Sequence, residues 1–243
     1  MARYFLELCY KGTAFSGFQR QDNAVTVQEE VEKALKIYFR DSFELTGSSR
    51  TDAGVHALSN FFHFDSDINE NEFSRSVYHL NAILPPDVVI KRIFRVNDDS
   101  HCRFDAISRS YEYYIHTAKD PFINDRSYFF PFKTDFSLLN EYASEIPYHN
   151  DFETFSKRNT QVHTYNCVIS ESVWKREGDR MIYRVTGTRF LRGMVRGLAG
   201  TMLRCGRQGC SVDEFRAIIL SKDVTRADFS VPGKGLFLVE VRY

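Results

Sequence analysis

The sequence has no run of 18 apolar residues and no excess of either charge. A membrane-spanning helix needs about 20 predominantly apolar residues, so none is predicted. Lysine plus arginine and aspartate plus glutamate both total 32, and the resulting net charge of zero gives no general indication of a polyanionic partner. A site for nucleic acid therefore needs a local concentration of positive charge. The first residues also lack the apolar core of a signal peptide, which predicts a cytoplasmic protein.

Paired cysteines and the common metal and cofactor motifs are absent too. The five cysteines are odd in number and nowhere spaced Cys-x-x-Cys, which argues against a disulfide framework or a zinc ribbon. His56 and His63 lie near Asp52 without a His-Glu-x-x-His motif, so histidines on a strand edge are a simpler interpretation than a catalytic zinc. The cysteine spacing predicts reduced thiols, and the missing ligand motif predicts no metal. Because no dinucleotide fingerprint or P-loop occurs, we also expect no nucleotide cofactor.

The apolar residues make up 43% of the 243 residues, enough for a large core, and they follow both strand and helix periods. Alternation predicts strands at residues 3–10, 87–96, 111–116, 164–174, 180–188 and 236–241. Helical spacing predicts helices from Thr26, over 73–84, 136–146 and 190–204, and from Ser211, the first and last opened by capping boxes. These elements predict an α+β fold of two similar α/β lobes, residues 1–104 and 105–243, with a largely antiparallel mixed sheet and a central catalytic cleft.

The segment from Ser49 to His56 is the most informative for chemistry. It follows strand-like residues 43–46 and carries Arg50 two residues before Asp52. The arginine favours an ionised carboxylate, and Gly54 permits a backbone geometry that other residues resist. A carboxylate held at a strand end can act as a covalent nucleophile. Asp52 capping its own loop in an Asx-turn fits the same spacing.

An arginine-rich segment later in the chain is a candidate RNA contact. If residues 188–200 are helical, Arg189, Arg192 and Arg196 share one sector of the helix. Gly193 and Gly200 fall in that sector, where missing side chains let another backbone or an RNA sugar-phosphate approach closely. The alternative is the ordinary solvated face of an amphipathic helix.

Two other segments carry residues that are common in RNA sites. Tyr111 and Tyr113 share one face of a predicted strand, where aromatic rings either stack on an extruded base or fill a core. The loop over residues 11–21 contains Gln19 and Arg20 among glycines and polar residues, and a basic loop of this kind can contact RNA.

The residues from Arg50 to His56, Arg-Thr-Asp-Ala-Gly-Val-His, resemble the signature of the TruA-type tRNA pseudouridine synthase family. Further matches follow in the same order, so that the resemblance covers nearly the whole chain. They are Tyr10-x-Gly12 with residues 17–21, His101-x-Arg103-Phe104, Tyr111-x-Tyr113, residues 190–196, Gly235-Leu236 and Val241-x-Tyr243.

The resemblance implies that the protein isomerises uridine to pseudouridine in the tRNA anticodon stem-loop, at nucleotides 38 to 40, without a cofactor. It implies Asp52 as the nucleophile, Tyr111 as the ring that stacks on the flipped base and as a candidate proton acceptor, and Arg196 as the partner of Asp52. It also implies a homodimer whose chains together form the RNA clefts. The residues we assign to substrate binding are Tyr111, Arg50, Arg196, Gln19, Arg20, His56, Arg189 and Arg192.

Three departures from the family pattern concern the RNA groove. Ser49 replaces a usual glycine, Phe18 a frequent tryptophan, and Arg192-Gly193 stands where a histidine often occurs. None of them is Asp52, Tyr111 or Arg196.

Two other classes of function remain open from the sequence. One is a non-catalytic RNA-binding module with RRM-like sheets, in which Tyr111 and Tyr113 stack bases, although the usual glycine- and aromatic-rich RRM core motif is missing. The other is a metal-dependent nucleic-acid hydrolase, which the missing ligand pattern disfavours.

Overall fold

A computed structural model describes residues 1–158 and 163–243 of the chain. By its internal contacts the chain divides into two compact units, Met1–Ile107 with Phe237–Tyr243, and Ser108–Leu236. Helices and strands occur in both, and most strand pairs within the units are antiparallel, which confirms the predicted α+β class. Within the described residues, no helix is both long and apolar enough to cross a membrane.

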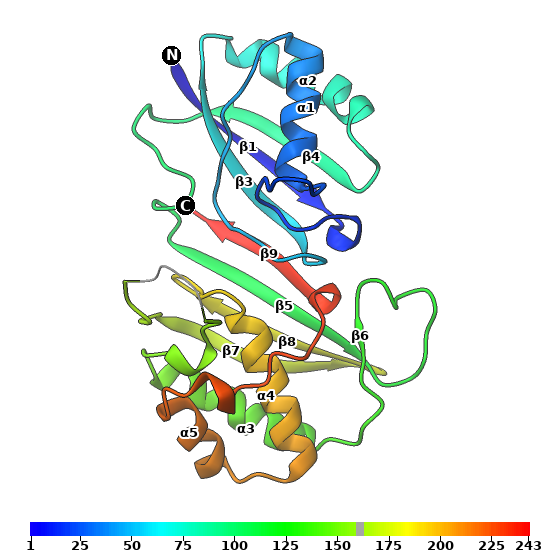
Figure 1. Ribbon diagram of the computed structural model, residues 1–243, viewed down its shortest axis with the longest axis vertical. Helices are drawn as coiled ribbons and strands as arrows, with labels where there is room; N and C mark the ends of the chain where they lie inside the picture. Colours follow the sequence, from blue (N-terminus) through cyan, green and yellow to red (C-terminus); the bar gives the residue numbers. More distant parts are fainter. Residues whose placement is uncertain (159–162) are drawn as a thin grey trace. The chain divides into compact units, whose positions relative to one another are not determined.

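The first unit is a mixed sheet packed with two helices (Figure 1). Its strands lie in the order β4 (Val88–Arg95), β1 (Ala2–Tyr10), β3 (His56–Ser66) and β9 (Leu236–Arg242), and the short β2 (Thr46–Gly47) also pairs with β3. The pairs β4–β1 and β1–β3 are antiparallel, whereas β3 and β9 are parallel. The helices are α1 (Val27–Phe39) and α2 (Glu70–Ile83).

Aromatic side chains hold the helices of this unit on the sheet. Phe73 of α2 lies with its ring centroid 4.7 Å from Tyr4 on β1 and 5.4 Å from Phe64 on β3. The ring centroid of Phe39, at the end of α1, lies 5.2 Å from that of Phe73. Buried aromatic pairs of this kind stabilise a fold beyond their burial of apolar area, by about 0.5–1.5 kcal/mol each. These contacts hold α1 and α2 against the sheet whose strand β3 follows the Asp52 loop.

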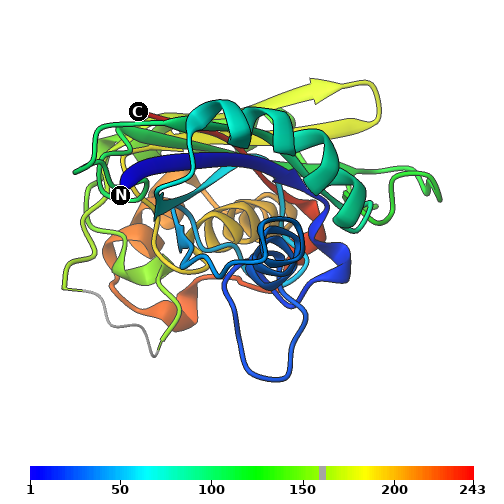
Figure 2. The ribbon, with the colours of Figure 1, turned by 90° about the horizontal axis from the view of Figure 1, so that it is seen from above.

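The second unit is built on three antiparallel strands in the order β5 (Ser108–His116), β8 (Arg180–Gly187) and β7 (Ile169–Glu177), with β6 (Tyr128–Phe129) parallel to β5. Figure 2 shows β7 and β8 as a long hairpin, in yellow. Gly178, in the turn between the two strands, has φ +59°. The helices are α3 (Phe136–Glu145), α4 (Met194–Gln208) and α5 (Val212–Leu220). Trp174 on β7 donates its indole N–H to the sulfur of Met202 on α4, which ties that helix to the hairpin.

Helix ends follow the local signals in most places. The capping box at Ser211 is complete, and α2 ends at Ile83, just before Pro85. The box predicted at Thr26 is only half formed: the Thr26 hydroxyl accepts from the Glu29 N–H at 3.3 Å, while the Glu29 carboxylate lies 3.3 Å from Lys33 instead of turning back.

Two predicted strands differ in extent. The strand-like residues 43–46 contribute only the two-residue β2, and β7 begins at Ile169 instead of residue 164. The prediction that His56 and His63 lie on a strand edge is wrong, because β3 is paired on both sides: His63 faces Phe5 of β1 and Thr46 of β2. Periodicity alone does not distinguish an edge strand from a central one.

Candidate functional site

Asp52 lies on a tight turn that leads into β3. The Val55 N–H donates to the Asp52 carbonyl oxygen at 3.2 Å, and Gly54, the third residue of this turn, has φ +76°. That positive φ is the signature of a type II turn, which needs glycine at this position because other residues meet a steric penalty there. Asp52 is half-buried. The main chain therefore fixes the turn and presents the aspartate at the start of a central strand.

The residues before Asp52 are held by a buried polar network. Asn60 on β3, 0% exposed, donates its side-chain N–H groups to the Ser49 carbonyl at 2.9 Å and to the Tyr10 hydroxyl at 3.1 Å. The same hydroxyl lies 2.8 Å from the Thr51 hydroxyl, and the Phe18 N–H donates to the Thr51 carbonyl at 3.1 Å. Breaking one member of such a network leaves buried partners unsatisfied, at about 1–3 kcal/mol each. Asp52 is thus attached to a rigid support.

Sequence reasoning missed Asn60 as part of the site. The signal was present in its surroundings: Asn60 is a polar residue followed by Phe61 and Phe62 in a strand, and a buried amide needs specific partners. Which partners it finds depends on the pairing of β3 with β1 and not on neighbouring residues.

The other end of the turn is pressed against Gly12. A Cβ added to Gly12 would stand 1.9 Å from the Val55 carbonyl oxygen, so only glycine fits here. The Gly12 N–H donates to Nδ1 of His56 at 3.1 Å, and an accepting Nδ1 means that His56 is neutral with its proton on Nε2. His56, 1% exposed, also stacks on Phe237 at 4.4 Å between ring centroids. The structure thus places His56 in the support of the Asp52 loop.

Arg50, Gln19 and Arg20 lie on the exposed surface of the first unit. Arg50 and Gln19 line one cavity, whereas Arg20 forms an ion pair with Glu32 at 3.2 Å. Of the predicted substrate-binding residues in this unit, Arg50 and Gln19 are therefore brought together, and Arg20 is partly engaged by α1.

The loop that carries His101 and Cys102 is attached to β3 through His63. The Cys102 N–H donates to Nδ1 of His63 at 3.4 Å, and the His63 ring lies 4.5 Å from His101. Burial, together with the nearby positive charge of His101 and Arg3, lowers the pKa of His63 to about 4. His63 is therefore neutral at pH 7, and the native state disfavours its protonation.

This lowered pKa predicts a loss of stability in acid. Between pH 6.5 and about 4 the unfolded chain binds a proton at His63 that the folded chain does not, so the free energy of unfolding falls as the pH falls. A His63→Gln variant lacks this titration. We expect the stability advantage of the wild type over this variant, measured by urea unfolding at pH 7.0, 5.5 and 4.5, to shrink at each step. A constant difference would show that His63 does not titrate in this range.

In the second unit, Tyr111 and Tyr113 lie on β5 with different surroundings. Tyr111 is 9% exposed, and its ring packs edge-to-face against Phe190 at 5.0 Å. Tyr113 is 0% exposed, donates its hydroxyl to the Pro232 carbonyl at 2.7 Å, and has its pKa raised by burial. Tyr113 is a core residue, so the pair of stacking rings that an RRM-like module needs is not presented by these two tyrosines.

The predicted arginine face of a helix over residues 188–200 is wrong. Helix α4 begins at Met194, because Gly193 has φ +76° and a left-handed residue cannot continue a right-handed helix. Arg189 and Arg192 therefore lie on the preceding loop. Gly200 does admit another backbone, but it is the chain's own: a Cβ there would stand 2.3 Å from the Asp228 carbonyl oxygen.

Arg196 lies in the first turns of α4 and is half-buried. Its guanidinium donates to the Val231 carbonyl at 2.8 Å and to the Phe229 carbonyl at 3.3 Å. These bonds fix the direction of the side chain and tie the segment before β9 to the helix. Among the described residues no cluster of three or more histidine, cysteine or acidic side chains is arranged to hold a metal ion.

Comparison with known proteins gives a consistent result. The model of the family described as tRNA pseudouridine synthase matches residues 9–105 and 149–243. A protein of Parabacteroides distasonis named tRNA pseudouridine synthase A is 43% identical over 243 residues, covering 100% of this chain and 96% of its own. Proteins of the same name from Porphyromonas gingivalis and Staphylococcus aureus are 42% and 34% identical, and cover 100% and 98% of this chain and 98% and 91% of their own.

Proposed function

The chain belongs to the TruA-type tRNA pseudouridine synthase family, and on that basis we propose that it converts uridines 38 to 40 of the tRNA anticodon stem-loop to pseudouridine, with Asp52 as the nucleophile. Pseudouridine synthases are isomerases. The observation that carries the assignment of Asp52 is its position: the family signature occupies the turn that Gly12, Asn60 and Tyr10 support from the chain's interior.

The reaction makes specific demands on the site. The bond between N1 of the base and C1′ of the ribose breaks, the base turns, and a bond from C5 to C1′ forms; C5 loses a proton and N1 gains one. No group is gained and no electrons are exchanged, so we propose that no cofactor takes part. A covalent adduct of the Asp52 carboxylate with C6 of the base or C1′ of the ribose would divide the rearrangement into easier steps. The target must first be flipped from its stack, at a cost of a few kcal/mol.

Residues of the second unit complete the proposal. We assign Tyr111 to stack on the flipped base and to accept the C5 proton directly or through water, and Arg196 to pair with the Asp52 carboxylate. Two observations support the assignments: Phe190 holds the Tyr111 ring at its edge, and two carbonyl groups fix the Arg196 guanidinium. A ring and a guanidinium that are already ordered lose little entropy on binding RNA.

The direct test is a turnover assay with transfer RNA that carries 5-tritiated uridine. Formation of the C5 to C1′ bond displaces tritium to water, so the protein alone should release tritium in the presence of a chelator. A non-catalytic RNA-binding module would bind the RNA and release none, and a metal-dependent hydrolase would cleave the RNA and lose activity with the chelator. Mapping of modified positions in tRNA from a deletion strain then identifies the uridines.

The loop arginines Arg189 and Arg192 are proposed to contact RNA phosphates. Removing one arginine that binds a phosphate should reduce the slope of log binding constant against log salt concentration by about one. We therefore expect the double variant Arg189→Ala, Arg192→Ala to lower this slope by about two, measured by tRNA binding between 50 and 200 mM salt. Arg176→Ala on the exposed side of β7 is the matched control. Unchanged binding by the double variant at every salt concentration would remove both residues from the RNA site.

The proposal extends to the oligomeric state of the protein and its cellular compartment. We propose a cytoplasmic homodimer whose two chains share the anticodon stem-loop. A chain with net charge zero can still attract RNA if its positive side chains are concentrated where the RNA binds.

A further inference from the structure

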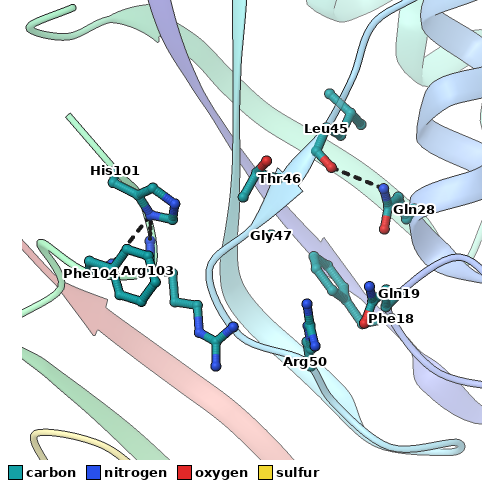
Figure 3. A pocket seen from close by; sticks show the side chains of 10 residues that line it. All are labelled: Phe18, Gln19, Gln28, Leu45, Thr46, Gly47, Arg50, His101, Arg103 and Phe104. Carbon is teal, nitrogen blue, oxygen red and sulfur yellow. Dashed lines mark hydrogen bonds between the residues drawn. The ribbon is translucent and has the colours of Figure 1, made fainter. Parts of the chain in front are cut away.

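We propose that the cavity beside the Asp52 loop binds a nucleotide that flanks the target uridine, with its base on Phe104 and a phosphate between Arg50 and Arg103. The inference rests on the proposed function and adds a second nucleotide site to it. The cavity lies wholly within the first unit and has a volume of about 190 Å³. Its walls include Phe18, Gln19, Gly47, Arg50, Arg103 and Phe104 (Figure 3).

The size of the cavity favours one part of a larger ligand. Pockets that enclose a drug-sized molecule have volumes of roughly 300–1,000 Å³. The cavity at about 190 Å³ is smaller and open to solvent, and two of its lining residues, Arg50 and Phe104, are exposed. A single base or phosphate of a longer strand fits this description.

The charge of the lining selects an anion. Arg50 and Arg103 supply the charge of the walls, and none of the ten lining residues is acidic. Arg50 is exposed, and no acidic side chain in the described part of the chain pairs with it. In a chain with equal numbers of acidic and basic residues, this is a local concentration of positive charge of the kind that phosphate recognition needs.

Phe104 gives the cavity a surface for a base. It is 73% exposed, its ring lies 4.3 Å from that of His101, and the Arg103 guanidinium lies 5.7 Å from its centroid. An exposed aromatic ring beside arginines is the arrangement on which single-stranded RNA bases stack, at about 1–3 kcal/mol per base.

The loop that carries Arg103 and Phe104 is ordered before any ligand binds. Nδ1 of His101 accepts from the Arg103 N–H at 3.1 Å and from the Phe104 N–H at 3.4 Å, as the dashed lines of Figure 3 mark. The Cys102 carbonyl accepts from the Tyr243 hydroxyl at 2.7 Å. A preformed loop lowers the entropic cost of binding.

The distance along the chain connects this cavity to the reaction. Arg50 and Asp52 are two residues apart, so their Cα atoms are at most about 7 Å from each other. That is comparable with the spacing of neighbouring nucleotides in an extended strand. A phosphate at Arg50 would therefore belong to the target uridine or to its immediate neighbour, and the base on Phe104 would be the neighbour's.

The test is a double-mutant cycle between protein and RNA. Dissociation constants and tritium release are measured for the wild type and for Phe104→Ala, with an anticodon stem-loop RNA and with RNAs that carry an abasic residue on either side of the target. We expect Phe104→Ala to weaken binding about 5- to 100-fold. At one flanking position, loss of the base should weaken wild-type binding to a similar degree and have little further effect on the variant. Tyr78→Ala, an exposed aromatic residue on α2, is the control.

A second cycle tests the phosphate. A methylphosphonate that removes the charge of the flanking phosphate should weaken binding by the wild type and not by Arg103→Gln, with the exposed Arg75→Gln on α2 as control. If the wild type is active but the losses in binding from the protein and RNA changes simply add in both cycles, the proposed flanking site is overturned. If the wild type releases no tritium, the proposed function itself is overturned, and with it the assignment of a target-adjacent nucleotide.

Discussion

Replacing Asp52 by asparagine is expected to abolish tritium release from tRNA, with a rate loss of at least about 10⁴-fold, while tRNA still binds. Asparagine has nearly the same shape as aspartate, but its amide carries no negative charge and does not form the adduct that the carboxylate forms. Because residues that act as one catalytic unit fail together, removal of a true nucleophile leaves only a small residual rate.

The turn that carries Asp52 should survive this substitution. It is closed by the main-chain bond from Val55 and supported by Asn60 and Tyr10, none of which uses the Asp52 carboxylate. We expect the circular-dichroism spectrum of the variant to match that of the wild type, and its tRNA dissociation constant to lie within about twofold of the wild-type value. Asp87→Asn, which changes a half-buried aspartate of the same unit, should keep full activity. Full activity of Asp52→Asn would remove Asp52 from its role.

Gly12→Ala is expected to have the largest effect on stability. The added Cβ would stand 1.9 Å from the carbonyl oxygen of Val55 and 2.5 Å from its carbonyl carbon, and both are main-chain atoms that cannot turn aside. Overpacking of a core costs about 1–3 kcal/mol, and more where backbones must separate. Separation here would also break the bond from the Gly12 N–H to His56. We expect a loss of about 3 kcal/mol, or a fall in melting temperature of about 6–12 °C.

The same substitution should lower activity before it unfolds the protein. Val55 closes the turn that begins at Asp52, so a displacement of Val55 moves the nucleophile. At 20 °C, where the variant is still folded, tritium release should therefore fall more than tRNA binding does, because small misplacements of a catalytic group cost much of the rate. Thr13→Ala, at the exposed neighbouring position, is the control. A Gly12→Ala protein that melts like the wild type would show that the two chain segments can move apart freely.

Elements with strong local signals were predicted well. The strands β1, β4, β5, β8 and β9, the helix before Pro85, and the capping box at Ser211 all lie where the sequence places them, within a few residues. A cap or a proline acts through atoms only a few residues away, so its effect can be predicted from the adjacent residues. The start of α4 was missed because Phe190, Met194 and Leu198 keep helical spacing across Gly193, whose left-handed backbone interrupts the helix.

The sequence by itself determined the family, the acidic residue at the centre of the proposed chemistry, and the type of most helices and strands. Only the tertiary structure decided that Asn60 supports the Asp52 loop, that Gly12 touches Val55, and that Arg50 and Arg103 line one cavity. The reason is physical: a signature or a cap depends on residues that are neighbours in the chain. These contacts depend on which strands pair and in what register, and that is set by the packing of distant segments together.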